Sequence, residues 1–349
     1  MQLDPLTLKQ FRRFRSIKRG YYSTIIFIIL LLFSFSSEIF TNSRALIVKY
    51  EGKLYFPTYG KIIPGKDFGL GYEYETNYRE LKRKFRNENE MEDNWILMPP
   101  IPYNALENDL VEGVYPPTAP SAKDHHYLGT DSTGRDILAR LIYGFRIAIL
   151  FSLVLLAGNY IVGISLGSLM GYFGGKFDLF FQRIIEIWAN IPFLYVVIIV
   201  AAIVTPNFFS LIGIMLFFGW MGMTWQMRTS AYKQKALGYV QAARSLGASH
   251  MRIIFKHIIP NSISLIVTFL PFSIAGGIVS LTSLDYLGFG LPAPTPSWGE
   301  LLHQGMSNLT ASWMVLSVTT AMILILVMVT FIGEAIREAF DPRKYSTYE

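Results

Sequence analysis

Six stretches of the chain are almost continuously apolar, and polar segments of very different length separate them. A membrane-spanning helix needs about 20 mostly apolar residues. The pattern predicts spans over 21–40, 146–173, 184–204, 209–227, 262–284 and 313–332. We therefore expect an all-α membrane protein with six transmembrane helices and a long polar segment after the first helix.

The composition supports a membrane protein and narrows its chemistry. The chain is 52% hydrophobic and only 16% charged, whereas soluble domains carry about 25% charged residues. A formal charge of +6 fits basic residues that gather on the cytoplasmic side of a membrane better than it fits nucleic-acid binding. The absence of cysteine excludes disulfides, thiolate metal sites and cysteine nucleophiles.

The short segments that flank the spans predict the orientation. Seventeen Lys and Arg residues lie on the flanks that share a side with the N-terminus, and none lies in the connections 205–208 and 285–312. Basic residues in short loops mark the cytoplasmic side. We predict that both termini and the loop after the fourth span are cytoplasmic. No small-residue cleavage site follows the first span, so we expect it to remain as a helix.

Two stretches outside the spans suggest ligands but do not fit them. GKIIPGKD, over 60–67, matches the start of a phosphate-binding loop. However, Asp67 stands where Ser or Thr would bind magnesium, and its charge would repel phosphate. In DHH, over 124–126, the residues are adjacent and no further His or Cys lies nearby to complete a ligand set, so we interpret His125 and His126 as ordinary surface residues.

Small residues and prolines mark special positions in the spans. Gly163, Gly167 and Gly171 recur every four residues, which places them on one face of a helix. Such a face lets two helices approach closely in lipid, and we expect it to pack within the chain rather than against another subunit. Pro192 and Pro271 are positions at which their spans would be loosened.

The loop GYVQAARSLGASHMRIIFKHIIPN, over 238–261, is too patterned for a simple connector. We predict helical pieces over 228–246 and 248–259 around Gly247, with Ala242 and Ala243 forming a small flat face and Pro260 beginning the next span. The second piece places five apolar residues at helical spacing: Met251, Ile254, Phe255, Ile258 and Ile259. The pattern fits a knob that docks into a protein groove and, equally, a helix that lies on anionic lipid.

QAARSLG followed by HIIPN resembles the EAA loop of permease subunits in ATP-binding-cassette (ABC) importers. That pattern reads Glu-Ala-Ala, three residues, Gly, nine residues, Ile-x-Leu-Pro. Ala242, Ala243, Gly247 and Pro260 match it, while Gln241 replaces the Glu and removes its charge. The resemblance implies that the loop, over 228–261, is a coupling helix that fits a cleft on a cytosolic ATPase subunit.

Three further stretches resemble the oligopeptide and dipeptide permeases: LGTDSTGRDILARLIYGFRIAI (128–149), LDYLGFGLPAPTPSWGELL (284–302) and REAFDPRKY (337–345). The long segment 41–127, with NWILMPPIPY, is similar to the microcin C permease branch. The resemblance implies the type I ABC importer permease fold. Its parts would be a cytoplasmic N-terminus (1–20), a first helix (21–40), a periplasmic subdomain (41–127), a permease domain (128–335) and a cytoplasmic C-terminus (336–349).

The resemblance also implies a function and partners. The chain would be a permease subunit of an ATP-driven importer of peptides, oligopeptide or microcin C-like, in the bacterial inner membrane. Its partners would be cytosolic ATPase subunits, a second homologous permease subunit, a periplasmic peptide-binding protein and membrane lipid, with no nucleic acid. The chain would bind no cofactor or metal and carry no catalytic residue, because the partner ATPase would use ATP and Mg²⁺. The pattern identifies no substrate-binding residue.

Two other classes of protein are alternatives. A stand-alone secondary transporter or channel often has two similar halves with broken helices, and the sequence contains no convincing internal repeat. A membrane-anchored enzyme would need catalytic groups in 41–127, and that segment offers no recognisable constellation.

Overall fold

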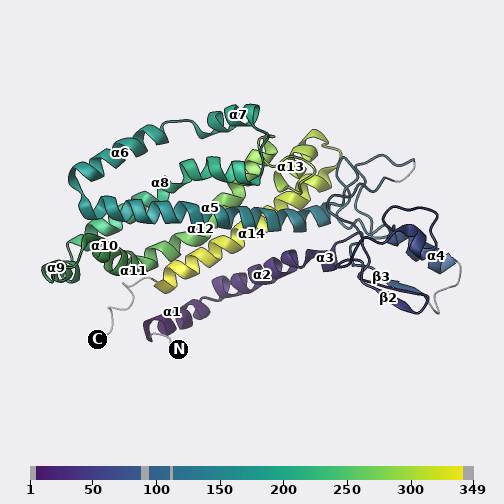
Figure 1. The fold of residues 1–349 in the computed structure, drawn as a ribbon, viewed down its shortest axis with the longest axis horizontal. Coiled ribbons are helices and arrows are strands. Elements are labelled where there is room, and N and C mark those ends of the chain that lie inside the picture. The colour runs from purple at the N-terminus through teal and green to yellow at the C-terminus, as the bar shows by residue number, and fades with distance from the viewer. Residues whose placement is uncertain (1–4, 88–93, 111–112, 341–349) are drawn as a thin grey trace.

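The computed structural model describes residues 5–87, 94–110 and 113–340. Figure 1 shows a bundle of long helices that run in similar directions, with a smaller unit containing strands at one end. The helices of the bundle are α1 (Pro5–Ser16), α2 (Lys18–Phe35), α3 (Ser37–Phe40), α5 (Ile137–Phe173), α6 (Gly175–Ala189), α7 (Phe193–Ile203), α8 (Phe208–Lys235), α12 (Ile263–Tyr286), α13 (Trp298–Ser307) and α14 (Ser312–Phe340).

Within the described residues, five helices are long and apolar enough to span a membrane: α2, α5, α8, α12 and α14. The pair α6–α7 gives a sixth span if it is counted as one, but the two helices are bent by 68°. The predicted third span, 184–204, is therefore broken, at the proline where loosening is expected. Pro192 precedes α7 and lacks the N–H that would continue the hydrogen bonds of α6. Pro271, in contrast, lies inside an uninterrupted α12.

The second span begins at Ile137, earlier than the predicted 146, because two arginines inside the helix have buried or half-buried partners. Arg140 pairs with Glu300, and Arg146 donates to Glu38 at 2.8 Å. Asp136 caps the helix by accepting a hydrogen bond from the backbone N–H of Ala139 at 2.7 Å. An apolar pattern alone ends at such charges, whereas the folded helix continues through them.

The glycine face of α5 packs within the chain, as predicted. Gly163, Gly167 and Gly171 all lie against α8, where an added Cβ would collide with the backbone near Thr224 and Arg228. The three glycines therefore set how closely α5 and α8 can approach.

The segment after the first span contains a small sheet, so the all-α prediction is incomplete. The antiparallel sheet has the order β2-β1-β3, formed by β1 (Ile47–Tyr50), β2 (Lys53–Tyr55) and β3 (Trp95–Leu97). Val48 faces Tyr55 on one side and Ile96 on the other. Together with α4 (Tyr78–Asn87), the sheet encloses a core of Ala45, Val48, Phe68, Leu81 and Phe85. The GKIIPGKD stretch ends in a short 3₁₀ helix, Gly65–Phe68, within this unit.

His126 is not an ordinary surface residue, and the interpretation of DHH is wrong for it. Only 6% of His126 is exposed. Its Nδ1 lies 2.8 Å from Asp136 Oδ2 and its Nε2 lies 3.2 Å from Asp109 Oδ2. The ring stacks on Tyr103 with the centroids 3.9 Å apart. Since Asp136 caps α5, His126 joins the segment that precedes α5, through Asp109, to the start of the longest helix.

The pairing of His126 predicts a pH dependence. Burial alone would lower the pKa of His126, but Asp109 and Asp136 outweigh it and raise the pKa to about 9 from 6.5. A raised pKa means that the ion pairs contribute fully below pH 6.5 and are lost as the pH rises through 9. We expect the free energy of unfolding to fall by roughly 3 kcal/mol over this pH range. In limited proteolysis of the detergent-solubilised protein, the segment that precedes α5 should be cleaved faster at pH 10 than at pH 6. His126→Gln should abolish this difference between the two pH values. A segment that opens equally at both pH values would contradict the assignment.

A buried group of four charged residues, termed the outer ion-pair cluster, joins the start of α5 to α13. It consists of Asp131, Arg135, Arg140 and Glu300. Arg135 donates to Asp131 at 2.7 Å and to Glu300 at 2.8 Å. Arg140 is fully buried, pairs with Glu300, and has its Nε 3.5 Å from Asp131 Oδ2. Two positive and two negative charges therefore balance inside the protein.

Candidate coupling site

The loop between α8 and α12 projects from the end of the bundle opposite the sheet. Figure 1 shows α9 (Gly238–Ser245) beyond the ends of the neighbouring helices. After it follow α10 (His250–Ile253), a π-helical turn (Ile254–Ile258) and α11 (Ile259–Asn261). The helix predicted over 228–246 is in fact two helices, because the chain turns at Ala236 and Leu237.

Gly247 closes α9 with a hydrogen-bonded turn that explains the Ala-to-Gly spacing. Its φ is +76°, a conformation that L-residues with side chains rarely adopt. The Gly247 N–H donates to the Arg244 carbonyl at 3.0 Å, and the Ala248 N–H donates to the Ala243 carbonyl at 3.1 Å. This pair of bonds is the Schellman motif, which ends a helix at a left-handed residue. The sequence signal EAA-x-x-x-G therefore encodes a helix end of fixed geometry.

The helix α9 has an inner and an outer face, and the two alanines do not share one. Val240 is buried and Ala243 packs beside it, against a cluster that includes Ile253, Ile254 and Ile258. Ala242 points outward with Gln241 and Leu246, whose exposed fraction is 88%. The predicted flat face of Ala242 and Ala243 is thus corrected: Ala243 seats the helix, and Ala242 is presented.

The predicted apolar face of the second piece is also only half right. Ile254 and Ile258 are buried and Ile259 packs against the same cluster, but Met251 and Phe255 are exposed. Ile253 is buried instead, and a π-helical turn over Ile254–Ile258 follows it in place of regular α-helical spacing. The exposed Met251 and Phe255 add apolar surface to the projecting loop.

A buried polar network, not evident from the sequence, connects the two sides of the loop. Gln234, near the end of α8, donates to Ser262 at 2.7 Å and to Ser230 at 3.0 Å. Tyr239, on α9, donates to Gln234 at 2.6 Å. Ser262 donates to the carbonyl of Ile258 at 3.0 Å. These bonds tie α8, α9 and the start of α12 together, so a displacement of α9 would be passed to both long helices.

Two further contacts attach the loop to the bundle. The Tyr172 hydroxyl, at the end of α5, lies 2.9 Å from His250 Nδ1. Arg228, on α8, forms two hydrogen bonds of 2.6 Å with Asp178 on α6. Pro260 is exposed and lies at the start of α11, where its missing N–H leaves no bond unmade. The next span begins at Ile263 rather than at Pro260 itself.

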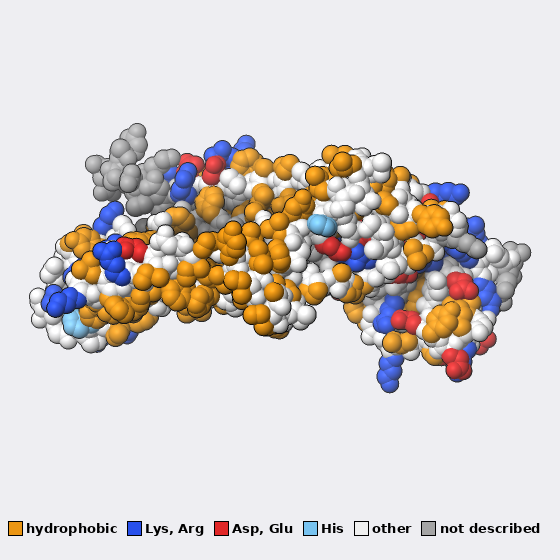
Figure 2. All heavy atoms as spheres, turned by 90° about the horizontal axis from the view of Figure 1, so that it is seen from above, with side chains coloured by type: hydrophobic (Ala, Val, Ile, Leu, Met, Phe, Trp, Pro, Cys, Tyr) orange, Lys and Arg blue, Asp and Glu red, His pale blue; other side chains and the backbone are white. Residues whose placement is uncertain are grey.

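The loop is basic and carries no acidic residue between 228 and 261. Figure 2 shows Lys and Arg mixed with hydrophobic side chains at the end of the molecule that bears α9. The exposed basic residues of this region include Lys233, Arg244, Arg252 and Lys256. The arrangement is a projecting, partly apolar surface with a basic rim.

Comparison with known proteins identifies the chain. Residues 163–345 match the family of the binding-protein-dependent transport system inner membrane component. The chain belongs to this family. The match includes the whole loop 228–261 and supports the type I ABC importer permease fold. As a member, the chain is a multi-pass inner-membrane transport subunit and not a stand-alone transporter or an enzyme.

Individual relatives place the permease more closely. It is 40% identical to the inner membrane ABC transporter permease protein YejE of Escherichia coli, over 98% of this chain and 99% of that protein. It is 38% identical to the peptidoglycan transport system permease protein YejE of Agrobacterium fabrum, over 98% and 94% of the two chains. The oligopeptide transport system permease protein OppC of Haemophilus influenzae is 34% identical over 64% of this chain and 73% of its own length.

These alignments separate the branch from the wider family. The two YejE proteins align along nearly the whole chain, including the long segment 41–127, which confirms the branch predicted from that segment. Among solved structures, the MetNI methionine ABC transporter matches at a TM-score of 0.49 and 15% identity, covering 59% of this chain and 98% of the matched chain.

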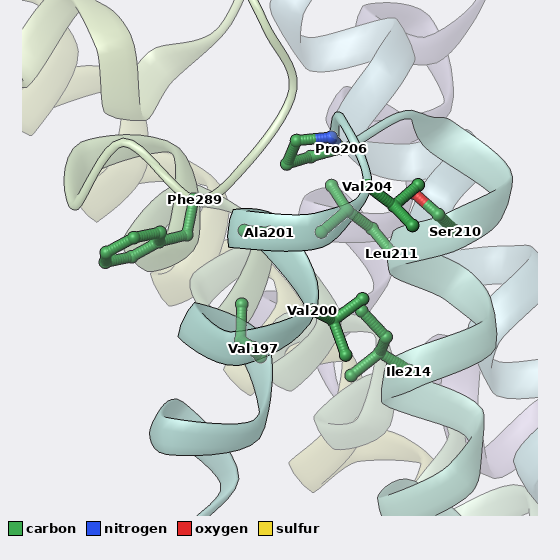
Figure 3. Close-up of a pocket in the computed structure, with 9 residues that line it drawn as sticks. All are labelled: Val197, Val200, Ala201, Val204, Pro206, Ser210, Leu211, Ile214 and Phe289. Atoms are coloured by element: carbon green, nitrogen blue, oxygen red, sulfur yellow. The ribbon is translucent and has the colours of Figure 1, made fainter.

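A shallow apolar hollow of about 190 Å³, including space open to solvent, lies between α7 and α8 (Figure 3). Its lining residues are Val197, Val200, Ala201, Val204, Pro206, Ser210, Leu211, Ile214 and Phe289. The hydroxyl of Ser210 already accepts a hydrogen bond from the Asn207 N–H at 2.8 Å, where it helps to cap α8. The lining carries no charge that could hold a peptide terminus.

Proposed function

We propose that this permease imports peptides or peptide-bearing molecules, driven by ATP that a separate ATPase subunit hydrolyses with Mg²⁺. The observation that carries this proposal is the full-length similarity to the YejE permeases together with the projecting loop 228–261. The name of one relative refers to peptidoglycan and those of others to oligopeptides and dipeptides. A microcin C-like peptide would belong to the same chemical class.

The coupling loop is the part that meets the ATPase. Ala242 and Gln241 lie on the outer face of α9, Ala243 packs on its inner face, Gly247 ends the helix, and Pro260 lies in α11 shortly before α12. A second, homologous permease subunit would complete the transport pathway. Closure of the ATPase on ATP would push α9, and the Gln234–Ser262 bond would pass that movement to α8 and α12.

The distribution of basic residues supports an orientation with both termini and α9 in the cytoplasm. The segment 41–127 is then periplasmic, where a peptide-binding protein would dock. Exposed apolar residues on this unit, such as Tyr59, Tyr74 and Tyr115, suit a protein contact. Arg343 and Lys344, which contribute to the charge pattern, lie outside the described residues.

The chain contains no cysteine, so single cysteines report directly on docking and orientation. We expect Ala242→Cys, treated with a short thiol-reactive crosslinker in native membranes, to form its main adduct with the ATPase subunit. Ala243→Cys is the matched control: it is the neighbouring alanine, but it packs inward and should react several-fold less. Mass spectrometry identifies the adducts. If a demonstrably labelled Ala242→Cys yields only lipid or self-adducts, the docking assignment is wrong.

The same chemistry tests the orientation. A membrane-impermeant thiol reagent added to spheroplasts should label Tyr115→Cys and should leave Ala242→Cys unlabelled until the membrane is opened. The reverse result would invert the proposed topology and remove α9 from the compartment that holds ATP.

A further inference from the structure

Helix α1 is held against the end of α14 by one of its faces. A Cβ on Gly20, just after α1, would collide with Ala335, so α2 and α14 are in close contact there. Arg19 pairs with Glu334 at 3.1 Å, and Arg13 lies 4.0 Å from Glu338. Of these contacts, the one from Arg13 belongs to α1 itself, whereas Arg19 and Gly20 lie at the start of α2. The exposure of the α1 residues shows which of them point away from the protein.

The opposite face of α1 combines apolar and basic side chains in one stripe. Leu8, Phe11, Arg12 and Arg15 follow the spacing i, i+3, i+4, i+7, which places them together on a helix. Leu8 is 41% exposed and Phe11 is 63% exposed. Both arginines are exposed too, and the sequence Pro5–Ser16 contains no Asp or Glu. A stripe of this kind is poorly suited to water alone.

We propose that α1 is an interfacial helix that binds anionic phospholipid. The helix ends at Ser16, immediately before the membrane-spanning α2, so its outer stripe lies at the level of the lipid headgroups. Leu8 and Phe11 enter the boundary between headgroups and acyl chains, and Arg12 and Arg15 reach the phosphates with their long side chains. The stripe carries positive charge and no Asp or Glu of its own, which selects anionic headgroups over zwitterionic ones.

The position of α1 favours lipid over the ATPase as its partner. Figure 1 shows α9 projecting beyond the bundle, while α1 lies beside the end of α14. A protein that docks on α9 meets the tip of the molecule, whereas the stripe on α1 flanks the membrane span. The contact of Arg13 with Glu338 means that lipid bound to α1 would also act on the end of α14.

The test places a fluorescent probe on Leu8→Cys in the full chain, co-expressed with its partner subunits and inserted into nanodiscs. We expect aqueous iodide to quench the probe strongly in discs of phosphatidylcholine and weakly in discs containing phosphatidylglycerol. Removing two basic side chains with Arg12→Gln and Arg15→Gln should weaken the partition of α1 onto the anionic surface by about thirtyfold. High salt should act in the same direction.

The matched control removes two exposed basic residues elsewhere in the chain, outside the loop 228–261, with Lys176→Gln and Arg183→Gln. This pair should leave the quenching unchanged. Equal quenching in both lipid compositions overturns the proposal, as does shielding that survives loss of Arg12 and Arg15. Shielding that appears only when the ATPase subunit is present overturns it in favour of a protein partner. None of these outcomes bears on docking at Ala242.

Discussion

Glu300→Gln is expected to destabilise the folded permease by roughly 3–5 kcal/mol, because it leaves buried positive charge without a partner. Glu300 accepts from Arg135 at 2.8 Å and also pairs with Arg140, which is fully buried. With the glutamine, two arginines face Asp131 alone. Glutamine has nearly the same shape as glutamate, so the loss reports the charge rather than a cavity. Thermal unfolding in detergent and the yield of folded protein in membranes measure it.

Glu73→Gln is the matched control. Glu73 also pairs with a basic residue, Lys66 at 2.9 Å, but its side chain is 83% exposed. Exposed ion pairs contribute little to stability because water screens them. The same chemical change should therefore have almost no effect at this site. Comparable unfolding temperatures for the two variants would contradict the assignment of Glu300 to a buried, charge-balanced cluster.

A double variant separates charge balance from packing. Arg140→Met alone leaves two carboxylates facing one arginine, and we expect it to be destabilising as well. Combining it with Glu300→Gln leaves Arg135 and Asp131, which neutralise each other. The double variant should therefore be more stable than the sum of the two single effects predicts, as contacting charges do not act additively. Additive losses would show that the cluster acts through shape alone.

The spans and the glycine face could be predicted because their signals are local. A long apolar run implies a membrane helix whatever its neighbours are, and glycines four residues apart share a face in any helix. The break at Pro192 has a local cause as well, although its angle depends on the packing of α7. The outer ion-pair cluster, in contrast, joins Asp131 and Arg135 to Glu300, far away in the sequence. A prediction from hydropathy ends an apolar span at such charges, so it cannot detect that they pair with each other in the folded chain.

The coupling loop shows the same division. The spacing of Ala243 and Gly247 is a local signal for the end of a helix, and the resemblance to the EAA loop identifies it in the sequence. Which alanine faces outward depends on the cluster around Ile253, and part of that cluster lies on a π-helical turn with no clear sequence signal. The interpretation of His126 is wrong for a related reason, since its two carboxylate partners lie 10 and 17 residues away on opposite sides of it, and no helical or strand spacing connects them.

Substitutions of Gly247 are expected to reduce coupled transport, least with Asn, more with Ala and most with Val. An added Cβ at Gly247 meets nothing within 4 Å, so the cost comes only from the backbone angle of +76°. Of the three substituents, Asn tolerates this conformation best. Ala makes the left-handed conformation less favourable by about 1–2 kcal/mol, and β-branched Val makes it less favourable still. A loss of 1–2 kcal/mol changes the population of the closed turn by a factor of about 5–30. Peptide uptake and the stimulation of ATP hydrolysis by the binding protein measure the effect in reconstituted complexes.

Gly238→Ala is the control that isolates the backbone angle. Gly238 also lies on α9, and an added Cβ there meets nothing within 4 Å, but its φ is not positive. The same change should be neutral or slightly stabilising, because Ala favours a helix more than Gly does. Equal activity of Gly247→Val and Gly238→Ala would mean that the closed turn is not needed for coupling. A loss confined to Gly247, in protein that inserts and unfolds normally, would show that α9 must keep its fixed end to act on α8 and α12.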